Sequence, residues 1–150
     1  QEKRDIGKHS IPRPEIDLLG FNQRENHLFA IEAKSYLDSP GVKFADLKED
    51  YDIPTGRYKL FTCKNYRDIV LKRLKSDLIE ANMANAETTI TLGLVAGNVY
   101  QNRNDEIREL FSAQGWLFWS PENVRDKVNA LAEKGYENEP AIITAKILMR

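Results

Sequence analysis

The sequence predicts an α/β fold in which helices flank a mixed β-sheet. Two strand-like runs near the start are joined by a short polar stretch, which is typical of a β-hairpin. Helix-like and strand-like runs then alternate to the end, with no repeat or low-complexity segment between them. A hairpin followed by this alternation favours helices packed on a sheet that holds both parallel and antiparallel pairs.

The bulk composition predicts one globular domain over residues 1–150. The 150 residues are 41% hydrophobic and 30% charged, which is enough apolar material for a real core. The sequence begins with Gln1, so it is either the whole domain or a piece of a longer chain.

Several classes of protein are disfavoured by composition. No stretch approaches the roughly 18 consecutive apolar residues of a membrane-spanning helix, and the charged start is unlike a secretory signal. Cys63 is the single cysteine, which excludes an internal disulfide and a cysteine-rich zinc site. We therefore expect a protein of the reducing cytoplasm that does not contact a membrane.

The expected elements follow one another without a long linker. They are strands over 15–21 and 28–34, a short helix over 42–50, a strand over 58–62, a helix over 66–83, a strand over 88–96, a helix over 105–114, a strand over 116–119, and two helices beginning at Pro121 and Pro140.

Local signals support each of these elements in turn. The break at 39–41 precedes the first short helix, and apolar residues recur at helical spacing over 66–83. The run over 88–96 is apolar and β-branched, as in a central strand covered on both faces. Gly115 closes the next helix, and Ser120 caps the one that begins at Pro121. The apolar run after Pro140 fits either a helix or a strand, and we favour a helix.

The hairpin brings charged residues together. A symmetric turn between Arg24 and Glu25 places Asp17 opposite Glu32 and Glu15 opposite Lys34. The two-residue period of a strand then puts these four charges on one face. The other face is expected to be the apolar core, lined by Ile16, Leu18, Phe29, Ile31 and Ala33.

Two carboxylates that face each other across paired strands need a cation. Like charges in this position are destabilising, and Lys34 lies diagonally across from Asp17. Carboxylate oxygens directed at one point also suit Mg²⁺, with water and phosphate oxygens completing its octahedron. A lysine beside such a metal neutralises a phosphate oxygen or lowers the pKa of the attacking water. The cluster is therefore suited to hydrolysis of a phosphodiester bond.

The residues 14–20 and 29–35, Pro-Glu-Ile-Asp-Leu-Leu-Gly and Phe-Ala-Ile-Glu-Ala-Lys-Ser, resemble the PD-(D/E)xK motif of restriction-endonuclease-like nucleases. The resemblance implies a restriction-endonuclease-like core and a DNA substrate. It implies that Asp17 and Glu32 bind Mg²⁺ or Mn²⁺ with the backbone carbonyl of Ala33, while Lys34 orients or activates the attacking water.

The chain departs from the family pattern in two ways. Its proline, Pro14, stands three positions before Asp17, and only 16 residues precede Asp17, where the family core normally has a helix and a strand. Many relatives take a further acid from that helix. Glu2 or Glu15 would substitute here, and the hairpin register favours Glu15 as an additional metal ligand.

Other residues carry weaker functional signals. A net charge of −1 and a pI near 6.2 mean that any nucleic-acid surface is a local patch. Four further groups are candidates for binding nucleic acid, although a structural role also explains each of them. They are His9 with Lys8 and Arg13, the helical flank of Lys64, Arg67 and Lys75, Tyr36 and Lys43 beyond the motif, and the aromatic group Trp116, Phe118 and Trp119.

The sequence thus predicts a metal-dependent DNA nuclease, acting either as two paired copies or with a partner subunit. Phosphate-binding glycine loops, a nucleophile elbow and paired His/Cys spacings are absent from it. Two alternatives stay open: a solvated, purely structural set of ion pairs on an exposed sheet face, and an inactive nuclease-like module in a larger assembly.

Overall fold

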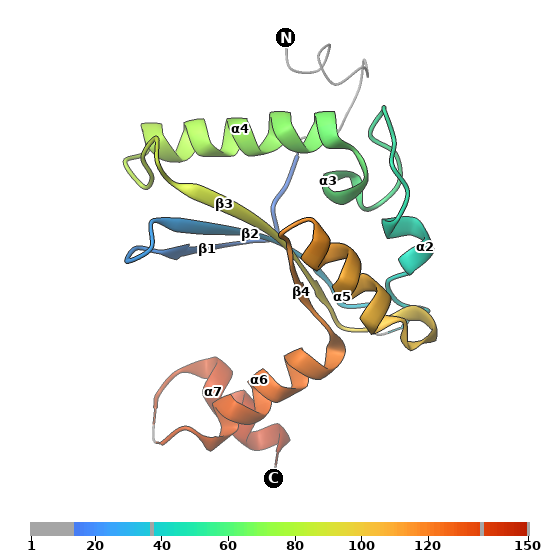
Figure 1. Ribbon diagram of the computed structural model, residues 1–150. Helices are drawn as coiled ribbons and strands as arrows, with labels where there is room; N and C mark the ends of the chain where they lie inside the picture. The colour runs from blue at the N-terminus through green and yellow to red at the C-terminus, as the bar shows by residue number, and fades with distance from the viewer. Residues whose placement is uncertain (1–13, 37, 136, 150) are drawn as a thin grey trace.

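The computed structural model describes residues 14–36, 38–135 and 137–149 and contains one four-stranded mixed sheet in the order β1-β2-β3-β4 (Figure 1). Strand β1 (Leu18–Asn22) is antiparallel to β2 (His27–Lys34). Strand β3 (Thr89–Ala96) is parallel to β2, and β4 (Leu117–Trp119) is parallel to β3. The predicted α/β class with a mixed sheet is confirmed.

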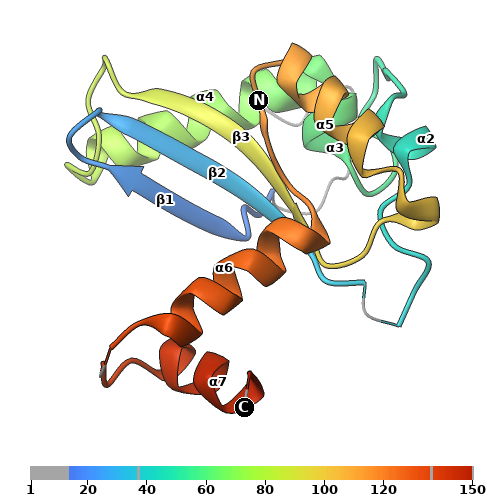
Figure 2. The ribbon, with the colours of Figure 1, turned by 60° about the horizontal axis from the view of Figure 1, so that its bottom comes forward.

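Helices connect and cover the strands. They are α2 (Phe44–Leu47), α3 (Lys59–Thr62), α4 (Lys64–Glu80), the 3₁₀ turn η1 (Tyr100–Asn102), α5 (Asn104–Ala113), α6 (Pro121–Glu133) and α7 (Pro140–Leu148). Side chains of α3, α4 and α5 pack together with one face of the sheet. On the other side, α6 leaves the end of β4 and contacts β3 and β4, and α7 packs against α6 (Figure 2).

The register of the hairpin is the one predicted. Leu19 pairs with Ala30, and the turn between the strands is symmetric about Arg24 and Glu25. The Asn22 side chain holds this turn, because its Oδ1 accepts hydrogen bonds from the backbone N–H groups of Arg24 and Glu25. The ladder ends at the pair of Leu18 and Ile31, so Asp17 lies one residue before β1 and next to the end of the ladder. The predicted strand pairing of Glu15 with Lys34 is not formed.

The prediction of which face is the core was wrong. The buried face of β2 carries Leu28 and Ala30, and Glu32 and Lys34 continue that same face toward the end of the strand. On the opposite face Leu18 is 59% exposed and Ala33 is exposed, although Ile31 is buried over Gly93. Both faces of β2 are largely apolar, so alternation alone did not indicate which one the helices cover. The charged cluster consequently lies at the rim of the main core.

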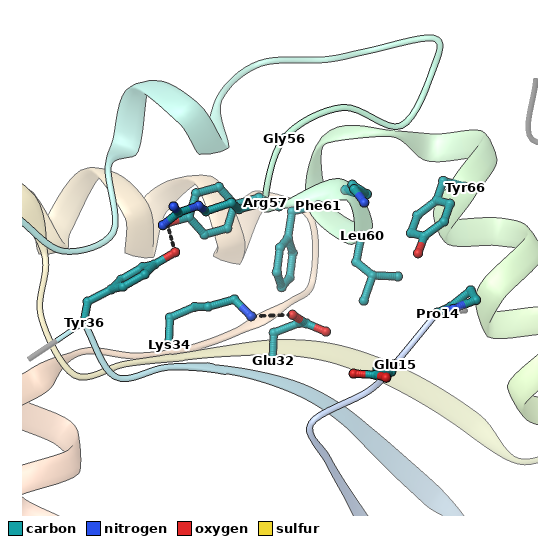
Figure 3. A pocket seen from close by; sticks show the side chains of 12 residues that line it. Pro14, Glu15, Glu32, Lys34, Tyr36, Gly56, Arg57, Leu60, Phe61 and Tyr66 are labelled. Carbon is teal, nitrogen blue, oxygen red and sulfur yellow. Dashed lines mark hydrogen bonds and ion pairs between the residues drawn. The ribbon is translucent and has the colours of Figure 1, made fainter. Parts of the chain in front are cut away.

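The strand predicted over 58–62 is the short helix α3. The amide of Phe61 donates to the Tyr58 carbonyl at 2.8 Å, and the Thr62 hydroxyl donates to the same oxygen at 3.1 Å. The consecutive buried residues Leu60, Phe61 and Thr62 point into the core from one helical turn, so they never alternate as strand residues do. This turn lies over the end of β2 that carries the charged residues (Figure 3).

The remaining elements agree with expectation. Strand β3 is central and has the consecutive buried residues Leu92, Gly93 and Leu94. Ser120 and Asn123 form a reciprocal cap at the start of α6, and the segment after Pro140 is helical. None of the helices in the described ranges is both long enough and apolar enough to span a membrane.

Candidate active site

Asp17, Glu32 and Lys34 converge at the end of the hairpin. The Lys34 Nζ lies 2.9 Å from Glu32 Oε2 and 3.5 Å from Asp17 Oδ2. One ammonium group thus contacts carboxylates from two neighbouring strand ends. The three predicted site residues share a common point in space.

The backbone of β2 fixes the position of Asp17. The Ala33 amide donates a hydrogen bond of 2.8 Å to Asp17 Oδ2, just before β1 begins. In an extended strand the N–H and C=O of one residue point to the same side, so the Ala33 carbonyl is also directed toward the β1 side, where Asp17 lies. The Lys34 carbonyl points the other way and accepts from the Gly97 amide of the β3 end. The Ala33 oxygen is accordingly placed as a third oxygen donor beside the carboxylates.

The cluster is half-buried. The side chains of Glu32, Lys34 and Asp17 are 13%, 21% and 39% exposed. This burial comes from α3 and α4, which cover the face of the sheet that carries Glu32 and Lys34. Glu32 and Lys34 are therefore shielded from solvent, whereas Asp17 lies at the exposed edge of the cluster.

The electrostatic environment keeps Lys34 protonated. Burial by itself lowers the pKa of Lys34, but the hydrogen bond to Glu32 and the negative charges of Glu32 and Asp17 outweigh it, so that the pKa is raised. Lys34 is therefore a cation at neutral pH in the absence of metal. As a cation it neutralises charge and donates hydrogen bonds, and it does not act as a base.

A pocket of about 410 Å³ lies over the cluster. Its floor is formed by Glu32 and Lys34, and Pro14 and Glu15 close one end (Figure 3). Glu15 lines this pocket, but it forms no ion pair with Lys34 in the described part of the chain. Within that part it also forms no three-carboxylate group with Asp17 and Glu32 that is suited to a metal. Asp17 is not part of the pocket wall and approaches Lys34 from the β1 side.

The roof of the pocket was missed by sequence reasoning. Arg57, Tyr58 and Lys59, at and just before the start of α3, line this side of the pocket. Tyr66 of α4 lies at the same end as Pro14 (Figure 3). Burial raises the pKa of the Tyr66 hydroxyl, and the charge of Glu32 raises it further, so this hydroxyl stays neutral beside the site. The segment between Tyr36 and Tyr58 connects β2 to α3. The spacing of residues in this connection does not predict that its basic residues lie over the hairpin.

Tyr36 borders the same pocket, as anticipated from its position after the motif. Its backbone φ of 44° lies in the left-handed region, which is unfavourable for a bulky side chain. Such a conformation costs on the order of 1–3 kcal/mol and persists only where the surroundings impose it. The Tyr36 hydroxyl accepts a hydrogen bond of 3.4 Å from the Tyr58 hydroxyl, and its ring lies 6.0 Å from the Arg57 guanidinium carbon.

The donor set fits one class of metal. No group of three or more His, Cys, Asp or Glu side chains suited to a metal occurs within residues 14–36, 38–135 and 137–149. Two carboxylates and one backbone carbonyl are too few for a closed zinc or calcium cage. They do fit Mg²⁺ or Mn²⁺, which is usually held by one or two carboxylates while water and substrate phosphate fill the other positions.

The weaker sequence candidates are mostly engaged in structure. Lys64 pairs with Asp68, Arg67 donates to the carbonyl oxygens of Leu60 and Phe61, and Lys75 donates to that of Ala86. Of these three cations, Lys64 is the one paired with a carboxylate, and Arg67 and Lys75 are held by carbonyl oxygens of the protein.

The other candidates lie in the core, away from the site, or outside the described residues. Trp116 packs against Phe61 and Phe111, and Phe118 is buried. Lys43 lies 5.5 Å from the Tyr100 ring and does not line the pocket. Glu2, Lys8, His9 and Arg13 fall outside the residues that the structure describes.

Comparisons of the chain with protein-family models, with curated proteins and with solved structures found no match in any of the three.

Proposed function

We propose that the protein is a metal-dependent nuclease that hydrolyses phosphodiester bonds in DNA. In this proposal Asp17, Glu32 and the carbonyl of Ala33 hold Mg²⁺ or Mn²⁺, and Lys34 serves the attacking water and the phosphate. The observation that carries the proposal is the convergence of both carboxylates on one Nζ atom, at 2.9 and 3.5 Å, inside a half-buried rim of the sheet.

The energetics of the cluster favour a functional origin. Two carboxylates placed together at a covered position lose solvation and repel each other, which costs stability unless a cation compensates. Lys34 supplies one positive charge against the two negative charges of Asp17 and Glu32. One net negative charge is left over, and a divalent ion would neutralise it.

The side chains divide the chemistry between them. A bound divalent ion would polarise a phosphate oxygen and lower the pKa of a coordinated water. The Lys34 ammonium donates to a non-bridging phosphate oxygen or to the attacking water, both within reach of its present position between the carboxylates. Hydrolysis adds the water oxygen to phosphorus and breaks one phosphorus–oxygen bond, and the leaving oxygen takes up a proton. The neutral Tyr66 hydroxyl is a donor near Glu32 that can orient water.

The choice of DNA follows from the resemblance of the motif to restriction-endonuclease-like nucleases. The order of elements supports the same kinship, because the antiparallel hairpin that carries the motif is followed by helix α4 and by the parallel strand β3. Action as a pair of copies or with a partner subunit stays a prediction.

A second candidate is a non-catalytic, nuclease-like interaction module. The observation that favours it is the same Lys34 ammonium, because it already compensates both carboxylates without any metal. The two candidates differ in their need for the ion: an enzyme requires it, and the module does not.

A cleavage assay tests the proposal. The full chain is incubated with plasmid and with single-stranded DNA in Mg²⁺ or Mn²⁺, beside Asp17→Asn, Glu32→Gln and Lys34→Ala. The first two changes remove a charge at nearly constant shape, so we expect folding to persist. The rate should fall by roughly 10²–10³-fold or more in each variant, and chelation of the metal should abolish cutting by the native chain.

A matched control is available on α4. Asp68 forms an exposed ion pair with Lys64 and does not line the pocket, and Asp68→Asn removes a carboxylate without touching the cluster. This variant should cut at the native rate. No metal-dependent cutting by the native chain, or equal cutting by all variants, would reject the nuclease in favour of the interaction module.

A further inference from the structure

The pocket over Glu32 and Lys34 has the chemistry of a nucleotide site. Its roof carries Arg57 and Lys59, and neither forms an ion pair with an acidic side chain within the described ranges. Its floor carries the Lys34 ammonium. These three cations outnumber the two carboxylates that line the same pocket, Glu15 and Glu32, so the pocket carries a net positive charge that attracts a phosphodiester.

The walls of the pocket provide a surface for a base. Tyr36 lies half-buried at the end of the pocket opposite Pro14, and its ring is turned toward Arg57 (Figure 3). Phe61 and Tyr66 add apolar surface deeper in the pocket. Aromatic rings beside cations are the combination with which proteins hold single-stranded nucleic acid, since a base stacks while the cation meets its phosphate.

The size and closure of the pocket limit what can enter. Its volume of about 410 Å³ lies at the small end of the range for ligand pockets, and the segment of Gly56 to Phe61 lies across it as a roof. A paired and stacked nucleotide cannot enter such a space until it is unpaired, and unpairing costs least in a single strand or a frayed end.

The charge of the chain points in the same direction. Duplex binding generally relies on a wide basic surface, whereas this chain has a net charge of −1. On α4, Lys64 is paired with Asp68, and the side chains of Arg67 and Lys75 are held by carbonyl oxygens of the protein. The cations that remain over the site are gathered at one pocket, which suits contact with a few phosphates of one strand.

We propose that this pocket receives one unpaired nucleotide of single-stranded DNA, with its phosphate on Arg57 and Lys59 and its base against Tyr36. The proposal rests on the nuclease function and adds its substrate class: the enzyme acts on unpaired DNA, and the scissile phosphate lies next to the captured nucleotide. Arg57 and Tyr36 are binding residues in this account, and they do not take part in bond breaking.

Binding measured without metal tests this proposal separately from catalysis. Fluorescence anisotropy in a chelator compares a labelled thymidine oligonucleotide with a blunt duplex of equal length. The native chain should bind the single strand at least about tenfold more tightly. Its affinity should fall with salt with a logarithmic slope of about −1.4, as expected for roughly two phosphate contacts on a single strand.

Variants assign the binding to the pocket. Arg57→Ala and Tyr36→Ala should each weaken single-strand binding roughly tenfold, and Tyr36→Phe should keep most of it because the ring remains. Arg125→Ala, which removes an exposed arginine of α6, is the control and should change affinity less than about twofold. Arg57 is fully exposed, so its loss should leave the thermal unfolding curve unchanged.

The outcomes separate the two proposals. Equal affinity for single strand and duplex, or unchanged binding in Arg57→Ala, would overturn the nucleotide pocket even if the protein cuts DNA. Strong single-strand binding that needs Arg57, in a chain that never cuts, would keep the pocket and reject the nuclease.

Discussion

Two kinds of ion pair in this molecule differ in where the chain places them. On helices α4 and α5 the pairs join residues three or four positions apart and are well exposed; Lys64 and Asp68, for example, are 76% and 55% exposed. At the end of the hairpin, Lys34 contacts Asp17 across the strands, in a half-buried position. The first kind arises from local helix geometry, whereas the second needs the whole sheet and its covering helices.

Of these two kinds of ion pair, the hairpin cluster is the one that lowers the free energy of unfolding. Exposed pairs of the helical kind contribute about 0.3–0.5 kcal/mol and need no further explanation. A covered cluster with two acids and one base is unfavourable unless another cation or a functional demand offsets its desolvation. The contrast singles out the site without reference to the motif.

The largest expected effect is on the cleavage rate, when one lysine of each kind of ion pair is replaced by methionine. Lys34→Met should reduce cleavage roughly 10²–10³-fold, because the phosphate loses its ammonium partner, whereas Lys64→Met should leave the rate within about twofold. Lys34→Met should also bind Mn²⁺ at least as tightly as the native chain, since the ammonium no longer competes for the carboxylates. Isothermal calorimetry measures this, and loss of Mn²⁺ uptake in Lys34→Met would contradict the assigned roles.

The next effect concerns the backbone that aligns the site. A Cβ at Gly97 would collide with the Ser35 carbonyl, directly beside Lys34. Gly97→Ala should therefore lower the free energy of unfolding by about 1–3 kcal/mol and reduce cleavage. Gly135→Ala adds a methyl group in open space and is the matched control in urea denaturation. Equal stability of the two variants would show that the ends of β2 and β3 tolerate displacement.

A smaller effect is expected from pH. The pKa of Tyr58 is raised by burial and by the Tyr36 hydrogen bond, and the pKa values of Tyr66 and Lys34 are raised too. Groups with a raised folded pKa contribute stability that is complete below their unfolded pKa, about 10 to 10.4, and is lost as the pH rises through the folded pKa. The free energy of unfolding should thus fall above about pH 10.

Tyr58→Phe checks the source of this fall. The variant should lose less stability between about pH 8 and about pH 11 than the native chain does. Tyr51→Phe, at an exposed tyrosine, should retain the native pH dependence. If Tyr58→Phe shows an unchanged slope in urea titrations at each pH, the burial of this hydroxyl does not govern alkaline unfolding.

The smallest effect tests the helical pairs themselves. Asp68→Ala should cost no more than about 0.5 kcal/mol and should lose even that in high salt, because both partners are exposed. A cost above about 1 kcal/mol in thermal or urea unfolding would remove the contrast drawn between the two kinds of ion pair.

The sequence predicted the parts of the site that depend on local rules. A short symmetric turn determines hairpin register, so the pairing of Leu19 with Ala30 followed from the sequence, and Asp17 lies just beyond the end of that ladder. The Gly115 stop and the Ser120 cap likewise located the end of α5 and the start of α6, whereas the segment of α7 fitted either a helix or a strand. These features depend on interactions between residues close in the chain.

The parts that depend on long-range packing were not predictable. Which face of β2 is covered is decided by α3, α4 and α5, and both faces of this strand are apolar enough to be buried. The segment over 58–62 has strand-like composition, yet its side chains fill the core from one helical turn. The placement of Arg57 and Lys59 beside the pocket of Glu32 follows from that packing, so the sequence did not predict the pocket.

The most direct test of the account is a calorimetric titration of Mn²⁺ into the native chain and into Glu32→Ala. The account predicts uptake of metal by the native chain and an affinity lower by at least about tenfold in the variant. Absence of any metal uptake by the native chain would contradict it, because the two carboxylates would then be satisfied by Lys34 alone.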